Sequence, residues 1–396
     1  MSAIRTALVI GGGIAGHTAA MALQKAGVEA SVYEAYPSPA DAIGGPIALA
    51  ANGVAGLRVI GAESAVLDHS YPISRQATQI GAKTIGMPSL ADVPAMRIIL
   101  RRELYAALHE LAAERGVETH YGKRLVAADE TGAGVTARFD DGTTATADLL
   151  IGADGVHSTA RRLIDAAAPG PKYTGMLSVD GWSPLEFGDP DVMYFTFGQK
   201  AYYLYWRHPE GGTVWGANLP QAEPMSVRDA RAVASERWRA TLLATYGADS
   251  PGGDLIRSTP PERLSATGAL FIMPSVPHWS RGRLVLVGDA VHAPSNSSGQ
   301  GASLSIESAV ELAKCLRDAA SVDEAVAAYE TLRRPRVEGI ARRANRVNQT
   351  KAPGRLGRAM AAALMPLIIK AAMDPEKTFG PDLRYRIDWD ERVAAR

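Results

Sequence analysis

Hydrophobic and polar positions at the start of the chain predict a strand, a helix and a second strand. Residues 6–10 form an apolar run that stops at three glycines, as expected for a buried strand. Residues 14–26 carry apolar side chains on one helical face and end at Gly27. Residues 29–34 then predict a second strand. Such a βαβ unit requires parallel strands joined by a right-handed crossover.

Further along, helical and extended patterns alternate. Helical periodicity predicts helices over residues 97–114, 299–317 and 323–350. Apolar or alternating runs predict strands within residues 118–140, 148–151 and 283–287. Pro335 is expected to kink or break the last of the three helices, because proline lacks the N–H that a helix interior uses.

Aromatic residues gather in one segment, residues 176–219, in short extended runs broken by Gly, Pro and Asp. This change of character predicts a separate antiparallel sheet. Residues 360–373, interrupted by Pro366 and Lys370, are expected to form an amphipathic helix that packs on the protein. Docking of that helix on a membrane surface is the alternative interpretation.

Composition narrows the function. The chain has 396 residues, enough for two domains, and its 42 basic and 42 acidic residues give zero formal net charge. This balance argues against nucleic acid or an anionic membrane as a partner. The single cysteine, Cys315, excludes an intrachain disulfide and is compatible with a reducing cytoplasm. No metal-ligand spacing of Cys and His and no apolar run of about 20 residues is present, so we expect neither a metal site nor a membrane span.

The first glycine-rich motif is suited to a pyrophosphate. Gly11, Gly13 and Gly16 satisfy G-x-G-x-x-G between the first strand and the first helix. They allow a tight turn, a close approach of a phosphate and close helix–strand packing at the positive end of the helix dipole. Glu34 follows 18 residues after Gly16, where an acid accepts hydrogen bonds from ribose hydroxyls. The motif predicts dinucleotide binding but does not separate NAD from FAD.

Two later motifs distinguish the two cofactors. A buried strand leads into Asp154-Gly155, and a second one leads into Gly288-Asp289. Asp289 is placed to accept a hydrogen bond from a ribityl hydroxyl. The segment 299–302 begins a helix whose N–H groups can stabilise the negative charge that a flavin gains on reduction.

Together, these three motifs resemble the signatures of the class A flavoprotein monooxygenases. That family has the para-hydroxybenzoate hydroxylase-like fold and includes aromatic polyketide hydroxylases and tetracycline-inactivating monooxygenases. Its Arg-x-x-Leu motif matches Arg101 to Leu104. By this resemblance Arg101 reaches the FAD, and the backbone of Leu125 contacts the adenine. The resemblance implies the FAD-binding residues Gly11, Gly13, Ile14, Ala15, Gly16, Glu34, Ala35, Arg101, Leu125, Asp154, Asp289, Gly299, Gly301 and Ala302.

The resemblance also implies the domain organisation. The expected fold class is α/β, with a Rossmann-like FAD-binding domain, an inserted antiparallel β-sheet substrate domain and a C-terminal helix. The FAD-binding domain is expected to comprise residues 1–70, 95–175 and 276–345. The substrate domain takes residues 71–94 and 176–275, and the C-terminal helical segment takes residues 346–396.

The implied activity is the hydroxylation of an aromatic or polycyclic small molecule with O2 through a flavin C4a-hydroperoxide. NADPH or NADH is the expected transient co-substrate, since the sequence has no second dinucleotide fingerprint. We assign no general base. Tyr203, Tyr205 and Trp215 are the candidates for a substrate wall, and the alternative is that these rings form the core of the sheet.

Some positions depart from the family pattern. Family members often carry a basic residue shortly before the pair that is Gly44-Gly45 here, where this chain has Asp41-Ala42-Ile43. Ser303 stands where many relatives have Asn. Two other functions stay open: an FAD-dependent oxidoreductase or oxidase without hydroxylation, and a flavin-binding relic without activity.

Overall fold

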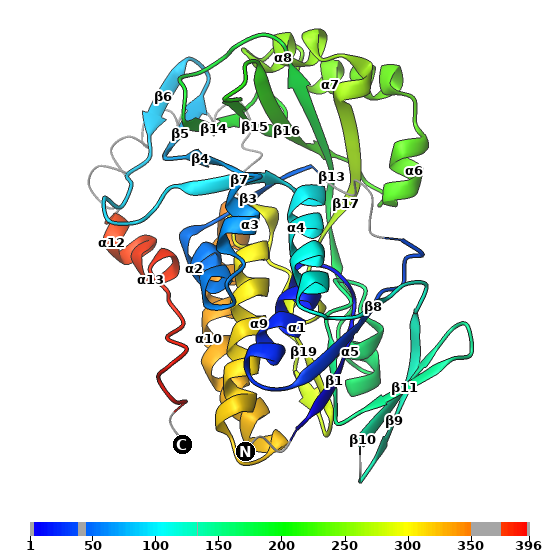
Figure 1. The fold of residues 1–396 in the computed structure, drawn as a ribbon. Helices are drawn as coiled ribbons and strands as arrows, with labels where there is room; N and C mark the ends of the chain where they lie inside the picture. The colour runs from blue at the N-terminus through cyan, green and yellow to red at the C-terminus, as the bar shows by residue number, and fades with distance from the viewer. Residues whose placement is uncertain (1–3, 39–44, 133, 350–373, 394–396) are drawn as a thin grey trace.

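The computed structural model describes residues 4–38, 45–132, 134–349 and 374–393. Its lower half in Figure 1 is built on a parallel sheet, and its upper half is built on a second, largely antiparallel sheet. The expected amphipathic helix over residues 360–373 and the three residues before Gly44 lie outside the described residues. None of the described helices is both long and apolar enough to cross a membrane.

The first sheet has six strands in the order β18-β19-β12-β1-β2-β8. All neighbours are parallel except β18 and β19. The predicted βαβ unit is its centre. The strand that leads into Asp154-Gly155, β12, lies beside β1, and the strand that leads into Gly288-Asp289, β19, lies on the far side of β12. The strands are β1 (Thr6–Ile10), β2 (Glu29–Tyr33), β8 (Thr119–His120), β12 (Leu149–Gly152), β18 (Ser280–Arg281) and β19 (Leu284–Leu286).

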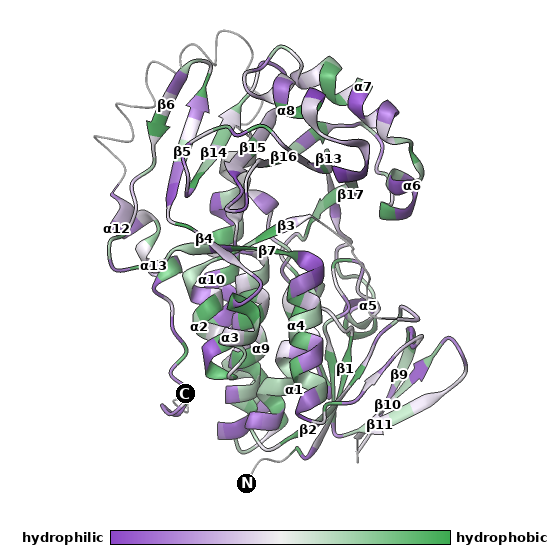
Figure 2. Cartoon of the chain, turned by 45° about the horizontal axis from the view of Figure 1, so that its top comes forward, coloured by the Kyte–Doolittle hydropathy of each residue, from purple (hydrophilic) through white to green (hydrophobic). Residues whose placement is uncertain are grey.

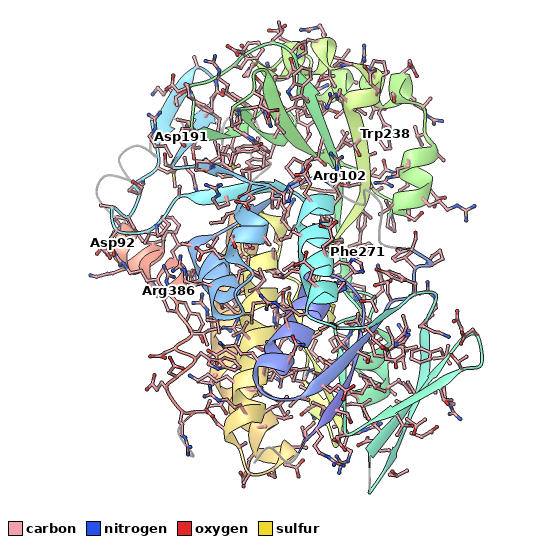
Figure 3. All side chains as sticks on the ribbon, in the orientation of Figure 1. Asp92, Arg102, Asp191, Trp238, Phe271 and Arg386 are labelled. Atoms are coloured by element: carbon pink, nitrogen blue, oxygen red, sulfur yellow. The ribbon has the colours of Figure 1, made fainter. Side chains whose placement is uncertain are left out.

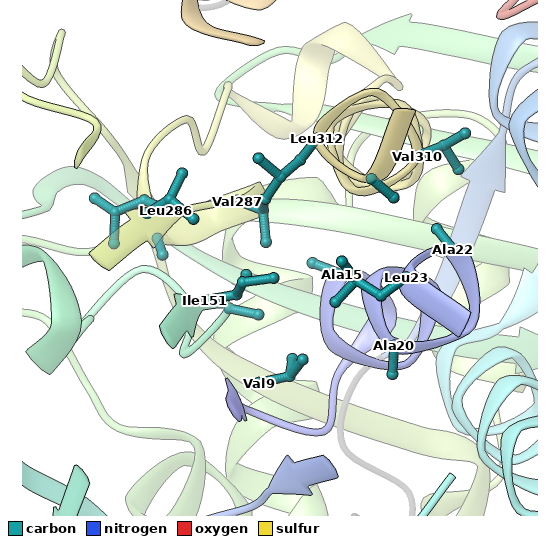
Figure 4. Close-up of a cluster of buried hydrophobic side chains, with 14 of the residues drawn as sticks. Val9, Ala15, Ala20, Ala22, Leu23, Ile151, Leu286, Val287, Val310 and Leu312 are labelled. Carbon is teal, nitrogen blue, oxygen red and sulfur yellow. The ribbon is translucent and has the colours of Figure 1, made fainter. Parts of the chain in front are cut away.

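Helices cover this sheet and enclose the main core. In Figure 4, apolar side chains of β1, α1, β12, β19 and α9 meet in one cluster, which includes Val9, Leu23, Ile151 and Leu312. Figure 2 shows the hydrophobic colouring concentrated on these central elements. The helices of this half are α1 (Ile14–Lys25), α2 (Ala51–Val59), α3 (Glu63–Leu67), α4 (Arg101–Glu114), α5 (Thr159–Ile164), α9 (Gly301–Asp318) and α10 (Val322–Gln349).

The second sheet has seven strands in the order β17-β13-β16-β15-β14-β5-β6. Its aromatic segment is antiparallel as predicted, while β14 pairs in parallel with β5, which comes from a distant part of the chain. The strands are β5 (Arg75–Ile80), β6 (Lys83–Gly86), β13 (Lys172–Ser183), β14 (Val192–Phe197), β15 (Tyr202–Arg207), β16 (Thr213–Pro220) and β17 (Leu264–Ile272). One face is covered by α6 (Val227–Ala232), α7 (Ser235–Tyr246) and α8 (Gly252–Ser258).

A small sheet, in the order β3-β7-β4, lies between the two halves in Figure 1. Its strands are β3 (Pro46–Leu49), β4 (Tyr71–Ile73) and β7 (Met96–Leu100). The predicted helix over residues 97–114 was therefore wrong in its first four positions. Ile98 and Ile99 are buried in β7, because their branched side chains and their pairing with β3 favour an extended chain.

A three-stranded sheet, in the order β11-β10-β9, projects from the lower half. It consists of β9 (Leu125–Thr131), β10 (Gly134–Phe139) and β11 (Thr144–Ala147). Short helical turns complete the described chain: η1 (Pro261–Arg263), η2 (Gly288–Ala290), η3 (Asn296–Ser298), α12 (Pro375–Thr378) and α13 (Gly380–Leu383).

Helix α10 continues through Pro335, so of the predicted kink or break the break does not occur, and the kink stays a prediction. Proline costs the helix one hydrogen bond. The flanking arginines compensate, since Arg333 and Arg336 both form ion pairs with Glu307 of α9.

Candidate flavin site

The glycine-rich loop between β1 and α1 has the shape that a phosphate requires. Gly11 has φ +103°, and a Cβ on it would lie 2.5 Å from the carbonyl oxygen of Ala153. A Cβ on Gly16 would overlap the carbonyl oxygen of Gly11. Gly13 is the N-cap of α1, and Ile14 and Ala15 form the first turn, where backbone N–H groups lack helical partners. The first N–H groups of α1 therefore have no partner within the helix and are suited to donate to a phosphate.

Glu34 follows β2 and lies beside this loop. Its Oε2 accepts a hydrogen bond of 2.6 Å from the backbone N–H of Gly12, and its Oε1 accepts one of 2.9 Å from Tyr36. Ala35 comes next, and both residues keep some accessible surface. The carboxylate is thus held at the carboxyl end of β2, where a parallel sheet places a ligand.

The late Gly-Asp motif lies at the carboxyl end of β19. Gly288 has φ +62°, and a Cβ on it would lie 2.7 Å from the Cβ of Ala15. Protein atoms surround Asp289 closely enough that burial raises the pKa of its carboxyl, while Arg101 acts to lower it. Even so, much of the Asp289 surface stays accessible. The carboxyl group of Asp289 is therefore surrounded by protein atoms and yet reachable by a ligand.

Arg101 begins α4 and links the two halves of the molecule. Although burial acts to lower the pKa of Arg101, the attraction of Tyr105, then of Asp289 and Asp180, raises it. Its Nε is buried and has no hydrogen-bond partner in the described part of the chain. Figure 3 labels the neighbouring Arg102, at the end of α4 that approaches the upper sheet. A buried guanidinium with an unused donor fits an anionic or polar ligand.

The N-terminus of α9 is also open. Gly299 has φ +60°, and a Cβ on Gly299 or Gly301 would meet nothing within 4 Å. Ala302 behind them is buried. The preceding Gln300 accepts a 2.8 Å hydrogen bond from Nδ2 of Asn52, which fixes the approach to the helix. This end of α9 can therefore face a ligand with its first N–H groups.

Two of the residues predicted to contact FAD, Asp154 and Leu125, also have a role in the fold. Asp154 caps α5: its carboxylate accepts hydrogen bonds from the Ser158 hydroxyl at 2.5 Å and from the backbone N–H groups of Thr159 and Ala160 at 2.7 and 3.0 Å. Burial raises the pKa of Asp154. Leu125 is buried at the start of β9 and pairs with Phe139. For both residues, contact with the cofactor stays a prediction.

The three aromatic rings predicted as a substrate wall lie on the other face of the sheet. Tyr203, Tyr205 and Trp215 are buried in a cluster with side chains of α7 and α8. The Tyr203 hydroxyl accepts a 3.3 Å hydrogen bond from the N–H of Gly252, and Trp215 donates one of 2.9 Å to Thr259. The structure does not support the substrate-wall interpretation, because these rings form the core under the outer helices.

Sequence reasoning missed a carboxylate on the opposite face, Asp180 of β13. It is surrounded by protein and interacts electrostatically with Arg101. The signal was an aspartate in the middle of a strand whose neighbours Val179 and Leu177 are buried. A charge at such a position is rare unless it has a partner or a ligand.

Comparison with known proteins identifies the family. A family model described as an FAD binding domain matches residues 5–344. The chain belongs to this family. The expected resemblance to class A flavoprotein monooxygenases is thereby confirmed, and this member is an FAD-dependent monooxygenase of the single-component hydroxylase type.

Similar proteins support this assignment. The 3-amino-4-hydroxybenzoate 2-monooxygenase of Streptomyces cremeus is 31% identical over 368 residues, which cover 86% of both chains. The aurachin C monooxygenase/isomerase of Stigmatella aurantiaca is 29% identical and covers 87% of this chain and 89% of that protein. A solved tetrameric form of 2-methyl-3-hydroxypyridine-5-carboxylic acid oxygenase is 26% identical, with a TM-score of 0.74 over 98% and 99% of the two chains.

The fold is shared more widely. Klebsiella pneumoniae HpxO, solved with FAD and uric acid, gives a TM-score of 0.82 at 24% identity and covers 96% of both chains. The predicted α/β fold class is therefore confirmed. The glycine cradle, the unpaired Nε of Arg101 and the open end of α9 all fit FAD.

Proposed function

We propose that this FAD-dependent monooxygenase hydroxylates an aromatic or heteroaromatic small molecule with O2 and takes its electrons from NADPH or NADH. The observation that carries the proposal is the convergence of Arg101, Asp289 and the open end of α9 below the antiparallel sheet. Similar proteins named as monooxygenases of small aromatic molecules support it.

The assigned roles follow the length of a dinucleotide across the parallel sheet. Glu34 and Ala35 bind the adenosine ribose, Leu125 borders the adenine, and the N-terminal loop holds the pyrophosphate. Arg101 and Asp289 hold the ribityl chain and the adjoining phosphate. The end of α9 faces the flavin ring. The loop and helix residues assigned in this way are Gly11, Gly13, Ile14, Ala15, Gly16, Asp154, Gly299, Gly301 and Ala302.

When it is bound, FAD supplies the electron transfer and the activation of oxygen. The chain supplies position and charge. Arg101 provides a fixed positive charge near the junction of the two sheets, and the dipole of α9 adds a partial positive charge at its N-terminus. The upper sheet covers the site and excludes water from it.

The decisive experiment is anaerobic stopped-flow reduction of the purified flavoprotein by NADPH or NADH, with and without aromatic ligands. A hydroxylase that couples reduction to substrate should reduce its flavin about tenfold faster with the right ligand, equivalent to about 1.4 kcal/mol of barrier. After air is admitted, mass spectrometry should show a product that has gained one oxygen atom.

Two other outcomes distinguish the alternatives. Fast reduction that ignores every ligand, with hydrogen peroxide as the product, indicates an oxidase. Failure of both nicotinamides to reduce the bound flavin indicates a flavin-binding relic.

A further inference from the structure

The carboxylate of Asp180 lies in an unusual position on the inner face of the upper sheet. Asp180 pairs with Gly216 of β16 and with Ser265 of β17. A Cβ on Gly216 would lie 2.9 Å from its Oδ1, and a Cβ on Gly45 would overlap its Oδ2. Two glycine backbones therefore make room for this one side chain.

No donor among the described residues hydrogen-bonds this carboxylate. Burial raises the pKa of Asp180 to about 7, and Arg101 is the one group that acts to lower it. Part of the side chain nevertheless stays accessible. Burying an acceptor without a hydrogen bond is costly, so these free oxygens are suited to a ligand that brings its own donor.

The surroundings of Asp180 favour a flat ring. Gly216 also pairs with Leu204, and Leu204 pairs with Phe195, so the four positions form one row across the same face of the sheet. The row consists of a carboxylate, a residue without a side chain and two apolar side chains. Leu204 and Phe195 pack with the residues of the small middle sheet rather than with the outer helices.

The row also lies close to the proposed flavin site. Arg101 interacts with Asp180 and with Asp289, which stands at the carboxyl end of the parallel sheet. The backbone N–H of Arg101 approaches the carbonyl oxygen of Gly45 at 3.4 Å, and Gly45 touches Asp180. Asp180 is thus on the wall of the upper sheet that looks towards the cofactor assigned above.

We infer that Asp180 is the residue that selects the substrate: its carboxylate accepts a hydrogen bond from an O–H or N–H group on the aromatic ring. The ligand class is an aromatic or heteroaromatic ring that carries a donor and no carboxylate near it. A carboxylate on the ring would bring a second negative charge against Asp180 and lose affinity. This inference rests on the proposed hydroxylase function.

Three naphthalene probes test the selection: 2-naphthol, 2-methoxynaphthalene and 2-naphthoate. All three contain the same ring system. The first carries a hydrogen-bond donor, the second carries no donor, and the third carries a negative charge. Isothermal titration calorimetry of the oxidised holoenzyme, without NADPH or NADH, measures the affinity of each probe. The titrations are made at about pH 8.5, above the pKa of about 7 to which burial raises Asp180, so that its carboxylate is charged. The wild type should bind 2-naphthol about tenfold or more tightly than either of the others.

The variant Asp180→Asn keeps the size of the side chain and removes its charge. This variant should bind 2-naphthol about tenfold more weakly than the wild type and bind 2-naphthoate more tightly, so that the order of the two affinities is reversed. Asp189→Asn is the matched control, because Asp189 is an exposed carboxylate next to the same sheet. Its affinities should equal those of the wild type. The flavin absorbance near the visible maximum reports that each variant retains its FAD.

The inference would be overturned if wild type and Asp180→Asn had the same affinity for 2-naphthol and the same affinity for 2-naphthoate. It would also be overturned by a wild type that binds 2-naphthoate as tightly as 2-naphthol, or that binds none of the three. The test is independent of turnover. If the variant reverses the affinities but the enzyme never oxidises NADPH or NADH, the inference about Asp180 stands and the proposed function is wrong. If the enzyme hydroxylates normally but the variant leaves the affinities unchanged, the proposed function stands and the inference about Asp180 is wrong.

Discussion

A carboxylate that protein atoms surround, but that accepts no hydrogen bond from a described residue, is the most informative feature at the scale of single residues. Asp180 and Asp289 are both surrounded by protein, and both interact with Arg101 without a direct hydrogen bond to it in the described structure. Isolated buried carboxylates destabilise a fold. Their retention here agrees with groups whose partner is a ligand, since functional sites are where such costs are tolerated.

Asp289→Ala should give largely apo protein whose fold is intact. The substitution removes the acceptor proposed for the ribityl chain, while no hydrogen bond to a described residue is lost and the burial cost of the carboxylate disappears. The flavin-to-protein absorbance ratio and the melting temperature of the apo form are the measurements. Asp129→Ala, at an exposed carboxylate on β9, is the control and should retain the flavin. Stoichiometric FAD in Asp289→Ala would refute the assignment.

Glu34→Gln should weaken FAD binding by roughly 1–3 kcal/mol, the range for a hydrogen bond to a charged group. The amide keeps one oxygen for Gly12 or Tyr36 but lacks the charge for the ribose hydroxyls. Fluorescence titration of the apo protein with FAD measures the dissociation constant. Glu118→Gln, an exposed position before β8, should leave that constant unchanged. An unchanged constant in Glu34→Gln would mean that Glu34 only supports the loop.

At the scale of elements, α9 serves both the site and the core. Its N-terminus faces the proposed flavin, while Glu307, about two turns further on, is fully buried against α10. Burial acts to raise the pKa of Glu307, but Arg333 and then Arg336 hold it below its usual range. Asn52 connects the two regions, because its Nδ2 donates to both Gln300 and Glu307.

Glu307→Ala should therefore lower the free energy of unfolding by about 3–5 kcal/mol, because it leaves the buried Arg333 uncompensated. Urea denaturation of the apo protein measures the change. Glu330→Ala removes one of the two carboxylates that pair with Arg334 on the half-exposed side of α10 and should cost less than about 1 kcal/mol. Similar losses in the two variants would show that the buried pair contributes no more than a surface pair.

The helices and strands also show which parts of the structure can be predicted from sequence patterns. The βαβ unit and the strands that lead into Asp154-Gly155 and Gly288-Asp289 were predictable, because each combines an apolar run with a glycine of positive φ, such as Gly11 or Gly288. Which face of the upper sheet is directed towards the cofactor was not predictable. Alternation separates Tyr203 from Leu204, but only the packing of α7 and α8 decides which of the two faces is covered.

At the scale of the whole molecule, the site lies where separate parts of the chain meet. β13 supplies Asp180, α4 supplies Arg101 and the strand-end turn η2 supplies Asp289. Short motifs predicted the parallel half, because its ligand contacts are local to loops. The contribution of the upper sheet depends on contacts between residues far apart in sequence, such as Gly45 and Asp180, which no local pattern records.

Two buried histidines should make the stability of the whole fold depend on pH. Burial, followed by the charge of His109, lowers the pKa of His17 to about 4. Burial, followed by Arg333, lowers the pKa of His292 to about 3. Unfolded histidine titrates near 6.5. As the pH falls below about 6.5, these histidines become protonated in the unfolded chain but stay neutral in the folded one. Their contribution to the free energy of unfolding, which is fully present at higher pH, is therefore lost.

The contribution of His292 can be isolated by a difference between proteins. Carboxylates with raised pKa, such as Asp180, act in the opposite direction, but they are common to wild type and variant and cancel. His292→Asn retains a polar group for the Ser308 hydroxyl, which lies 2.8 Å from the imidazole Nε2. Between pH 6.5 and about 4.5 the wild type should lose up to about 1.4 kcal/mol per pH unit more than this variant.

Urea denaturation of the apo proteins at three pH values in that range measures the difference. The apo form is used because bound FAD would shift the apparent stability by mass action. His278→Asn, at an exposed position, should follow the wild type at every pH. Parallel pH profiles for wild type and His292→Asn would mean that His292 becomes protonated without unfolding the core, and the buried contact with Ser308 and Arg333 would have to open to admit the charge.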